Sequence, residues 1–178
     1  VTSSGLGSKG SDGINTTGSD LEVAAYKNIV EWLNGKRKAY SDKTSNQEVK
    51  ADWSNGNVAM TGLSWAGTTT FGVASTGVEG LKTIVPAAGI ASWYDHFNSQ
   101  GSPLDTGASN DLSWLSVYTS GRILDKEDWD KVKDYYAAYI TKLNELQHKD
   151  GHNYNEEYAK RDYTLNAANL KAAPLIIQ

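Results

Sequence analysis

Six consecutive residues, Gly62-Leu63-Ser64-Trp65-Ala66-Gly67, have the types and order that acyl-transfer chemistry requires. They follow the apolar run Val58–Thr61, so they predict a strand that enters a sharp turn carrying a serine. Such a nucleophile elbow lifts the hydroxyl of Ser64 above the sheet, and it needs small neighbours because the next helix returns close to the strand. Gly62 and Ala66 are small enough. The alternative interpretation is an ordinary strand-to-helix turn that carries a serine.

A nucleophilic serine needs a base to take its proton, a carboxylate to orient that base, and backbone donors for the oxyanion. The backbone N–H of Trp65 is the natural first donor. The chain has three histidines. His148 and His152 lie in a charged segment typical of a solvated helix end and turn, and His96 lies among aromatic residues, which favours a pocket wall or a core position. We therefore expect the catalytic base to be absent from this chain.

Two other patterns resemble ligand sites but lack the necessary context. His148 and His152 have a spacing that a metal pair could use, yet no third ligand accompanies them, so we expect no metal. Residues 5–10, Gly-Leu-Gly-Ser-Lys-Gly, match the letters of a dinucleotide fingerprint, which requires a strand before it and a helix at its end. The polar stretch 11–19 separates this segment from the nearest helical pattern. We therefore expect a glycine-built loop and no cofactor.

The elements around the serine alternate between helical and strand periodicity. This alternation predicts a parallel sheet with helices on its faces. A long amphipathic segment near the C-terminal end then predicts a helical block between two strands of the sheet. The expected helices cover residues 20–34, 68–76 and 128–146, the expected strands cover 57–61, 81–85 and 174–177, and a surface loop covers 41–50.

Composition narrows the classes of function. The net charge of −4 argues against a nucleic-acid or anionic-membrane surface, which would need a basic stripe. No apolar stretch approaches the roughly eighteen residues of a membrane span. The absence of cysteine excludes disulfides and thiolate metal sites. A first residue of valine and a final apolar run lead us to expect that the chain belongs to a longer parent protein.

The residues around the elbow carry a resemblance to a known family. Three segments resemble the X-prolyl dipeptidyl aminopeptidases, which belong to the cocaine-esterase-like branch of the α/β hydrolases. They are residues 55–65, Asn-Gly-Asn-Val-Ala-Met-Thr-Gly-Leu-Ser-Trp, and residues 75–81 and 88–94. The segments 5–8 and 29–35 are also similar to the family. The late glycine of the elbow, Gly67, is similar to the family's form of the motif.

The resemblance implies a partial α/β-hydrolase fold with a nucleophile elbow and a helical cap insertion. It implies a core fragment over residues 1–100, the cap over 101–172 and the start of the next core strand over 173–178. Ser64 would be the acylated nucleophile, and the N–H of Trp65 would hold the oxyanion. Trp65 and Trp93 would border a proline pocket, because flat aromatic walls suit a pyrrolidine ring. The substrate-binding set implied by the resemblance is Trp65, Trp93, Tyr94, His96 and Asn110.

Two residues depart from the family pattern. His96 stands where the family has tyrosine, and Asn110 stands near the position where the family has a glutamate that would pair with the free amine of the substrate. An amide cannot supply the charge of that glutamate. The expected partners are a peptide with proline at its second position and the remainder of the parent chain, which would carry the catalytic aspartate and histidine. An esterase or acylase on the same fold, and a non-catalytic module that grips peptide or sugar, remain alternatives.

Overall fold

The computed structural model describes residues 1–105, 111–120 and 126–178, and these residues form two compact units. The sheet unit comprises residues 23–91 and 163–178, and the helical unit comprises residues 1–22 and 92–162. Among the described residues, no helix combines the length and apolar character needed to cross a bilayer. The expected division into core and cap stays a prediction.

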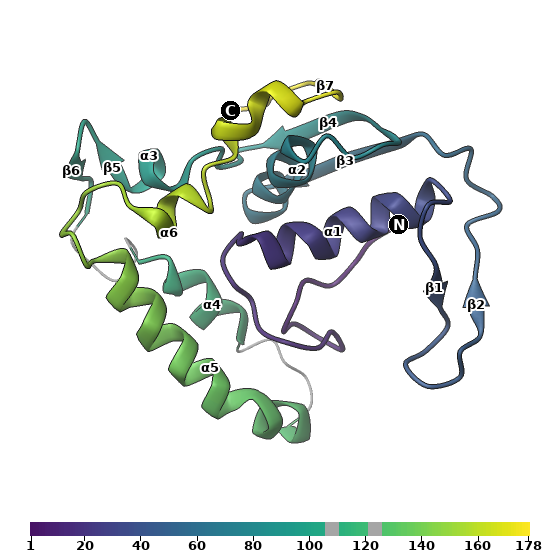
Figure 1. Cartoon of the computed structure of the whole chain (residues 1–178), viewed down its shortest axis with the longest axis horizontal. Helices are drawn as coiled ribbons and strands as arrows, with labels where there is room; N and C mark the ends of the chain where they lie inside the picture. The colour runs from purple at the N-terminus through teal and green to yellow at the C-terminus, as the bar shows by residue number, and fades with distance from the viewer. Residues whose placement is uncertain (106–110, 121–125) are drawn as a thin grey trace. The chain divides into compact units, whose positions relative to one another are not determined.

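The secondary structure alternates through the sheet unit and is mainly helical in the other unit (Figure 1). In chain order the elements are α1 (Asp20–Leu33), β1 (Ala39–Tyr40), β2 (Glu48–Val49), β3 (Val58–Leu63), α2 (Trp65–Ser75), β4 (Leu81–Ala87), α3 (Trp93–Phe97), β5 (Asn98–Ser99), β6 (Ser102–Pro103), α4 (Ser113–Ser120), α5 (Lys126–Gln147), α6 (Glu156–Ala159), the 3-10 segment η2 (Tyr163–Asn169) and β7 (Ala173–Pro174).

A three-stranded parallel sheet in the order β3-β4-β7 forms the centre of the sheet unit. Met60 of β3 lies opposite Ile84 of β4, and Ile84 lies opposite Pro174 of β7. Pairing continues beyond β7, because the N–H of Ile177 donates to the carbonyl oxygen of Pro86 at 3.0 Å. The parallel sheet expected from the alternating pattern is therefore confirmed.

One face of this sheet is covered by α2, which lies along β3 and β4 (Figure 1). The core beneath α2 is built from aliphatic side chains of α1, α2, β3 and β4, with Val73 and Ile84 completely buried. Burial of such side chains is the main stabilising contribution to a unit of this size. The buried members of the cluster are Val30, Val58, Val73, Ala74, Val78, Leu81, Ile84 and Ala172.

Two glycines allow α2 to start directly on the sheet. A Cβ atom on Gly62 would lie 2.4 Å from the carbonyl carbon of Ala66, and one on Gly67 would lie 2.7 Å from the carbonyl oxygen of Ala87 and 2.9 Å from that of Gly62. All these neighbours are backbone atoms, which cannot move aside without displacing a strand or the helix. The position of α2 therefore depends on the absence of side chains at residues 62 and 67.

The segment 41–50 is exposed throughout, as expected of a surface loop, but it contains the short strand β2. Residues on either side of its tip pair as a short antiparallel hairpin, with Ala39 opposite Val49 and Tyr40 opposite Glu48. The carboxylate of Asp42 accepts hydrogen bonds from the hydroxyl of Ser45 and from the backbone N–H groups of Thr44 and Ser45, and these bonds hold the pKa of Asp42 well below its usual range. The strands have two residues each, too few for a period-two pattern to be visible.

Buried polar contacts organise the helical unit. Arg161 is 1% exposed and donates to the carbonyl oxygens of Thr17 at 2.8 Å and Thr16 at 3.0 Å. Its Nη1 also donates to the carboxylate of Glu157 at 2.9 Å. The opening loop is thereby joined to α6, across more than 140 residues of sequence.

The same loop is joined to the start of α1 by Glu22. Its carboxylate accepts hydrogen bonds from the backbone N–H of Gly18 at 2.8 Å, from that of Thr16 at 3.1 Å and from the side-chain amide of Asn15 at 2.8 Å. Burial raises the pKa of Glu22 to about 7, although these hydrogen bonds act in the opposite direction. Glu22 therefore caps the loop with a carboxyl group that ionises near neutral pH.

We predict that Gly67→Ala destabilises the protein by about 1–3 kcal/mol, because its Cβ atom overlaps two carbonyl oxygens. Denaturant unfolding measures the change. Gly10→Ala is the control, because a Cβ atom there meets nothing within 4 Å, and its effect should stay within about 0.5 kcal/mol. Equal stability of the two variants would show that α2 does not need the glycine.

Arg161→Met should lower the free energy of unfolding by about 3–5 kcal/mol, since it leaves the carboxylate of Glu157 and two carbonyl oxygens without their buried partner. Lys160 is the other cation that pairs with Glu157, and its side chain is half exposed. Lys160→Met should therefore lower the free energy of unfolding by less than about 1 kcal/mol. If Arg161→Met lowers the free energy of unfolding as little as Lys160→Met does, the buried contacts of Arg161 do not hold the opening loop.

The raised pKa of Glu22 predicts that stability depends on pH. The ordinary pKa is 4.5 and the folded value is about 7, so the folded chain holds a proton that the unfolded chain has released between these values. The free energy of unfolding should therefore fall as pH rises from 4.5 to about 7, by at most about 1.4 kcal/mol per pH unit. Glu22→Gln should remove most of the pH dependence of the free energy of unfolding in this range. An unchanged slope would show that other groups cause the pH dependence.

Candidate active site

Ser64 occupies the turn between β3 and α2 in a strained backbone conformation. Its φ of 57° and ψ of −120° are values that residues with a side chain seldom adopt. The side chain is exposed, and it makes no capping hydrogen bond to α2 although Ser64 is the N-cap residue. The sequence motif therefore folds into the strand, sharp turn and helix that a nucleophile elbow requires.

Backbone hydrogen bonds on both sides of Ser64 hold the strained turn. The N–H of Ser64 donates to the carbonyl oxygen of Ala87 at 2.8 Å. The carbonyl oxygen of Ser64 accepts from the N–H of Thr68 at 2.8 Å and from its hydroxyl at 3.1 Å. The same hydroxyl accepts the N–H of Ile90 at 2.9 Å. Thr68 thus connects the elbow to the segment that follows β4, a role that the sequence motif did not reveal.

Trp65 is the first residue of α2 and is half-buried. The N–H groups in the first turn of a helix have no intrahelical acceptor and carry the positive end of the helix dipole. Such a position suits a developing oxyanion next to Ser64. The expected oxyanion role of Trp65 is compatible with this placement and stays a prediction.

The expected substrate-binding aromatics lie on α3, in the helical unit. Ser92 caps this helix, with its Oγ accepting the N–H of Asp95 at 3.3 Å. Trp93 is 2% exposed, and its ring packs against His96 and Phe97 at centroid separations of 5.9 and 5.6 Å. Trp93 is therefore a buried centre of this cluster, and its role at a substrate pocket stays a prediction.

Tyr94 belongs to a tyrosine cluster that the sequence did not reveal. Its ring lies edge-on to Tyr154 and Tyr158, with centroids 5.2 and 5.1 Å away. The hydroxyl of Tyr154 donates to the carboxylate of Asp162 at 3.0 Å, and burial together with that carboxylate raises the pKa of Tyr154 to about 12. The two tyrosines from residues 154–158 thus extend the aromatic surface around Tyr94. A pair of tyrosines four residues apart was the available signal.

Each histidine already has neighbours in the helical unit, whereas Ser64 belongs to the sheet unit. A ring nitrogen of His148 lies 2.7 Å from Oδ1 of Asp111, and the ring of His152 lies edge-on to that of His148. His96 packs against the aromatic residues of α3, and the resulting partial burial lowers its pKa. Across residues 1–105, 111–120 and 126–178, no three metal-ligating side chains form a cluster. Asn110 lies outside the described residues.

The glycine-rich opening forms a tight loop. The N–H of Gly7 donates to the carbonyl oxygen of Asp12 at 3.0 Å, and Gly7 has a φ of +66°. A Cβ atom at Gly7 would lie 2.6 Å from the Cα of Ile14, so the glycine permits two backbone segments to approach closely. The first described helix begins only at Asp20. The loop predicted for this segment is confirmed.

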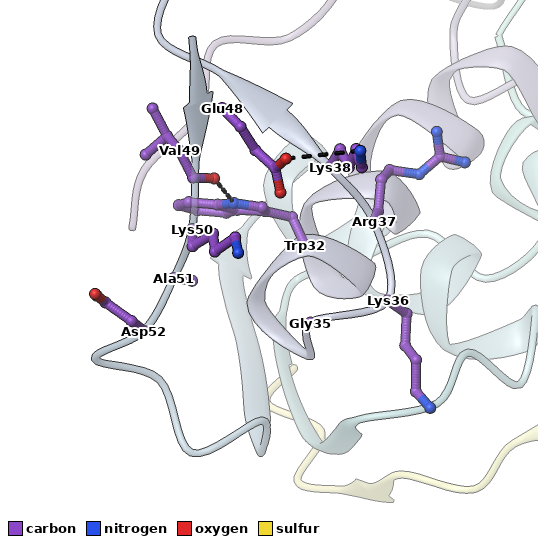
Figure 2. Close-up of a pocket in the computed structure, with 10 residues that line it drawn as sticks. All are labelled: Trp32, Gly35, Lys36, Arg37, Lys38, Glu48, Val49, Lys50, Ala51 and Asp52. Carbon is purple, nitrogen blue, oxygen red and sulfur yellow. Dashed lines mark hydrogen bonds and ion pairs between the residues drawn. The ribbon is translucent and has the colours of Figure 1, made fainter.

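A separate hollow lies between the end of α1 and the hairpin, and Ser64 does not line it (Figure 2). It has a volume of about 520 Å³. Trp32 is fixed in its wall, because the indole N–H donates to the carbonyl oxygen of Val49 at 2.8 Å. The ammonium of Lys38 lies 3.6 Å from the carboxylate of Glu48, and Arg37 pairs with Glu31 at 2.9 Å. These pairings neutralise cations that an anionic ligand would need.

Comparisons with known proteins match the whole length of the chain to one family. All residues, 1–178, match the X-Pro dipeptidyl-peptidase (S15) family. Xaa-Pro dipeptidyl-peptidases of the Streptococcus pneumoniae strains Hungary19A-6 and G54 are 41% identical to this chain over 172 residues. The matched region covers 95% of this chain and 23% of those relatives, so the chain spans about a quarter of their length.

Solved structures support the fold. A crystal structure of a CocE/NonD family hydrolase from Staphylococcus aureus superposes with a TM-score of 0.59 at 22% sequence identity, over 94% of this chain and 25% of the other. A second structure of that hydrolase gives a TM-score of 0.55 at the same identity. The mixed α/β fold with a parallel sheet is thus that of the CocE/NonD hydrolases. With a serine elbow in this fold and a family match along its whole length, the chain belongs to the S15 family of X-Pro dipeptidyl-peptidases.

Proposed function

We propose that Ser64 is the nucleophile of a serine peptidase that releases X-Pro dipeptides from peptide N-termini. The observation that carries the proposal is the strained backbone of Ser64 at the junction of β3 and α2. Strain of this kind persists only where the surroundings over-determine it, and it concentrates at functional sites. Membership of the S15 family supplies the substrate class.

In the proposed reaction, Oγ of Ser64 attacks the carbonyl carbon of the second substrate residue while a base takes the hydroxyl proton. The N–H of Trp65 stabilises the oxyanion that forms on the carbonyl oxygen. The base returns the proton to the leaving amine, and the dipeptide remains as an ester on Ser64. Water activated by the same base then releases the dipeptide and restores the serine.

We place the catalytic aspartate and histidine outside these 178 residues. Two findings support this assignment: His96 and His148 already contact other side chains within the helical unit, and the S. pneumoniae relatives are far longer than this chain. A serine without its base is a poor nucleophile. The isolated chain should therefore be inactive, and the remainder of the parent protein is its proposed partner.

Trp65, Trp93, Tyr94, His96 and Asn110 are the proposed substrate-binding residues. Aromatic faces offer apolar area to a pyrrolidine ring, which has no donor of its own once proline is in a peptide bond. The amide of Asn110 would meet the free amine of the substrate without a compensating charge. This residue favours a second candidate, an esterase or acylase on the same fold, because such an enzyme does not require amine recognition.

The two candidates differ in their preferred substrate. We predict that the parent protein hydrolyses an alanyl-prolyl anilide faster than a simple aryl ester, and that Ser64→Ala lowers kcat for both by roughly 10⁴-fold or more. Ser45→Ala, in the exposed hairpin, is the matched control and should leave kcat unchanged. Faster ester hydrolysis would favour the esterase or acylase. Release of the anilide by the isolated chain would refute the placement of the base.

A further inference from the structure

The chain contains two Asn–Gly sequences, Asn34-Gly35 and Asn55-Gly56, and the fold treats them differently. Asparagine is a chemically labile residue. Its usual route of decay is attack by the next backbone nitrogen on the side-chain amide carbon, and a following glycine offers the least steric hindrance to that attack. Sequence alone would therefore rank both sites as equally labile.

Asn55 lies in the exposed turn that leads into β3. Its Oδ1 accepts the backbone N–H of Asn57 at 3.0 Å, which polarises the side-chain carbonyl and can hold negative charge that develops on the oxygen. The attacking group would be the nitrogen of Gly56, whose N–H donates to Oγ of Ser54 at 3.1 Å. That hydroxyl gives the departing proton an acceptor beside solvent. Gly56 also has a φ of +82°, which glycine adopts without strain.

Asn34, directly after α1, makes contacts that hinder ring closure. Its Nδ2 donates to the carbonyl oxygen of Gly56 at 2.7 Å, and its backbone N–H donates to Val30 in the last helical turn at 2.9 Å. Its side chain packs against Gly80 so closely that a Cβ atom there would lie 2.6 Å from Nδ2. The N–H of Gly35 is also engaged, by the carbonyl oxygen of Trp32 at 3.0 Å. Ring closure at Asn34 therefore requires local unfolding.

We propose that Asn55 is a site of spontaneous deamidation and that the fold protects Asn34 from the same reaction. The nitrogen of Gly56 forms a bond to Cγ of Asn55 and loses its proton, and the Cγ–Nδ2 bond breaks to release ammonia. Water then opens the resulting succinimide at either carbonyl, which leaves aspartate or isoaspartate at position 55. The net reaction consumes one water and releases one ammonia, and it needs no enzyme. It is independent of the role of Ser64.

The modification would act on the entry to the strand that ends at Ser64. Isoaspartate adds one carbon to the main chain between residues 55 and 56. Gly56 supplies the carbonyl oxygen that accepts Nδ2 of Asn34, and Val58, two residues later, donates its N–H to Gly80 at 2.8 Å. Lengthening the backbone here would disturb both contacts. Deamidation at Asn55 is thus an ageing reaction that loosens the start of β3.

Peptide mapping of the intact protein during incubation in mildly alkaline buffer tests the proposal. Deamidation adds about one dalton to the peptide. It should accumulate at Asn55 at least about tenfold faster than at Asn34, because Asn34 can react only in the small fraction of molecules that are locally unfolded. In concentrated urea the two rates should become similar. Asn55→Gln, which disfavours ring closure, should remove the signal assigned to that turn.

Either of two results would overturn the proposal. Asn34 could deamidate as fast as Asn55 in the native protein, which would mean that its contacts give no protection. Alternatively, Asn55 could stay intact in the native protein while both sites react in urea, which would mean that the turn itself blocks ring closure.

Discussion

The close approach of α2 to the ends of β3 and β4 is the constraint on which the site depends. The helix begins immediately after Ser64, so its first turn lies against the strand that precedes it, and only glycine fits at positions 62 and 67. The positive φ of Ser64 is a consequence of reversing the chain within one residue. Hydrogen bonds to Ala87 and Thr68 then hold the strained residue between the parallel sheet and the helix.

The helical unit depends on a different kind of interaction. Its centre holds a guanidinium and a carboxyl group, Arg161 and Glu22, which both form hydrogen bonds with the backbone of residues 16–18. Thr17, within this loop, also has a positive φ and is completely buried. Buried polar and ionisable groups of this kind are costly to leave without partners, so they select one conformation for a glycine-rich segment that has no regular structure. The two units thus combine an apolar sheet core with a polar, loop-fixing core.

Local patterns in the sequence were sufficient for much of this fold. The helical period of residues 20–34, the long amphipathic segment 128–146 and the alternation around Ser64 predicted α1, α5 and the elements on either side of the serine. The β1–β2 hairpin was missed because its strands are short and exposed. Arg161 and Thr68 were missed for another reason: their functions arise from contacts with residues 144 and 22 positions away, respectively, and no periodicity reports such contacts. Gly62 and Ala66 were the small neighbours expected at the elbow, and in the structure Gly67 also lies against the carbonyl oxygen of Ala87.

The strained elbow should present Ser64 as a nucleophile once its base is supplied. Intact mass after fluorophosphonate treatment tests this directly, with the 178-residue chain compared with a protein extended past Gln178 and with Ser64→Ala as the control. We predict one adduct on the extended protein, located at Ser64 and lost in the variant, and none on the shorter chain. An extended protein that stays unlabelled at Ser64 would show that Ser64 is not the nucleophile.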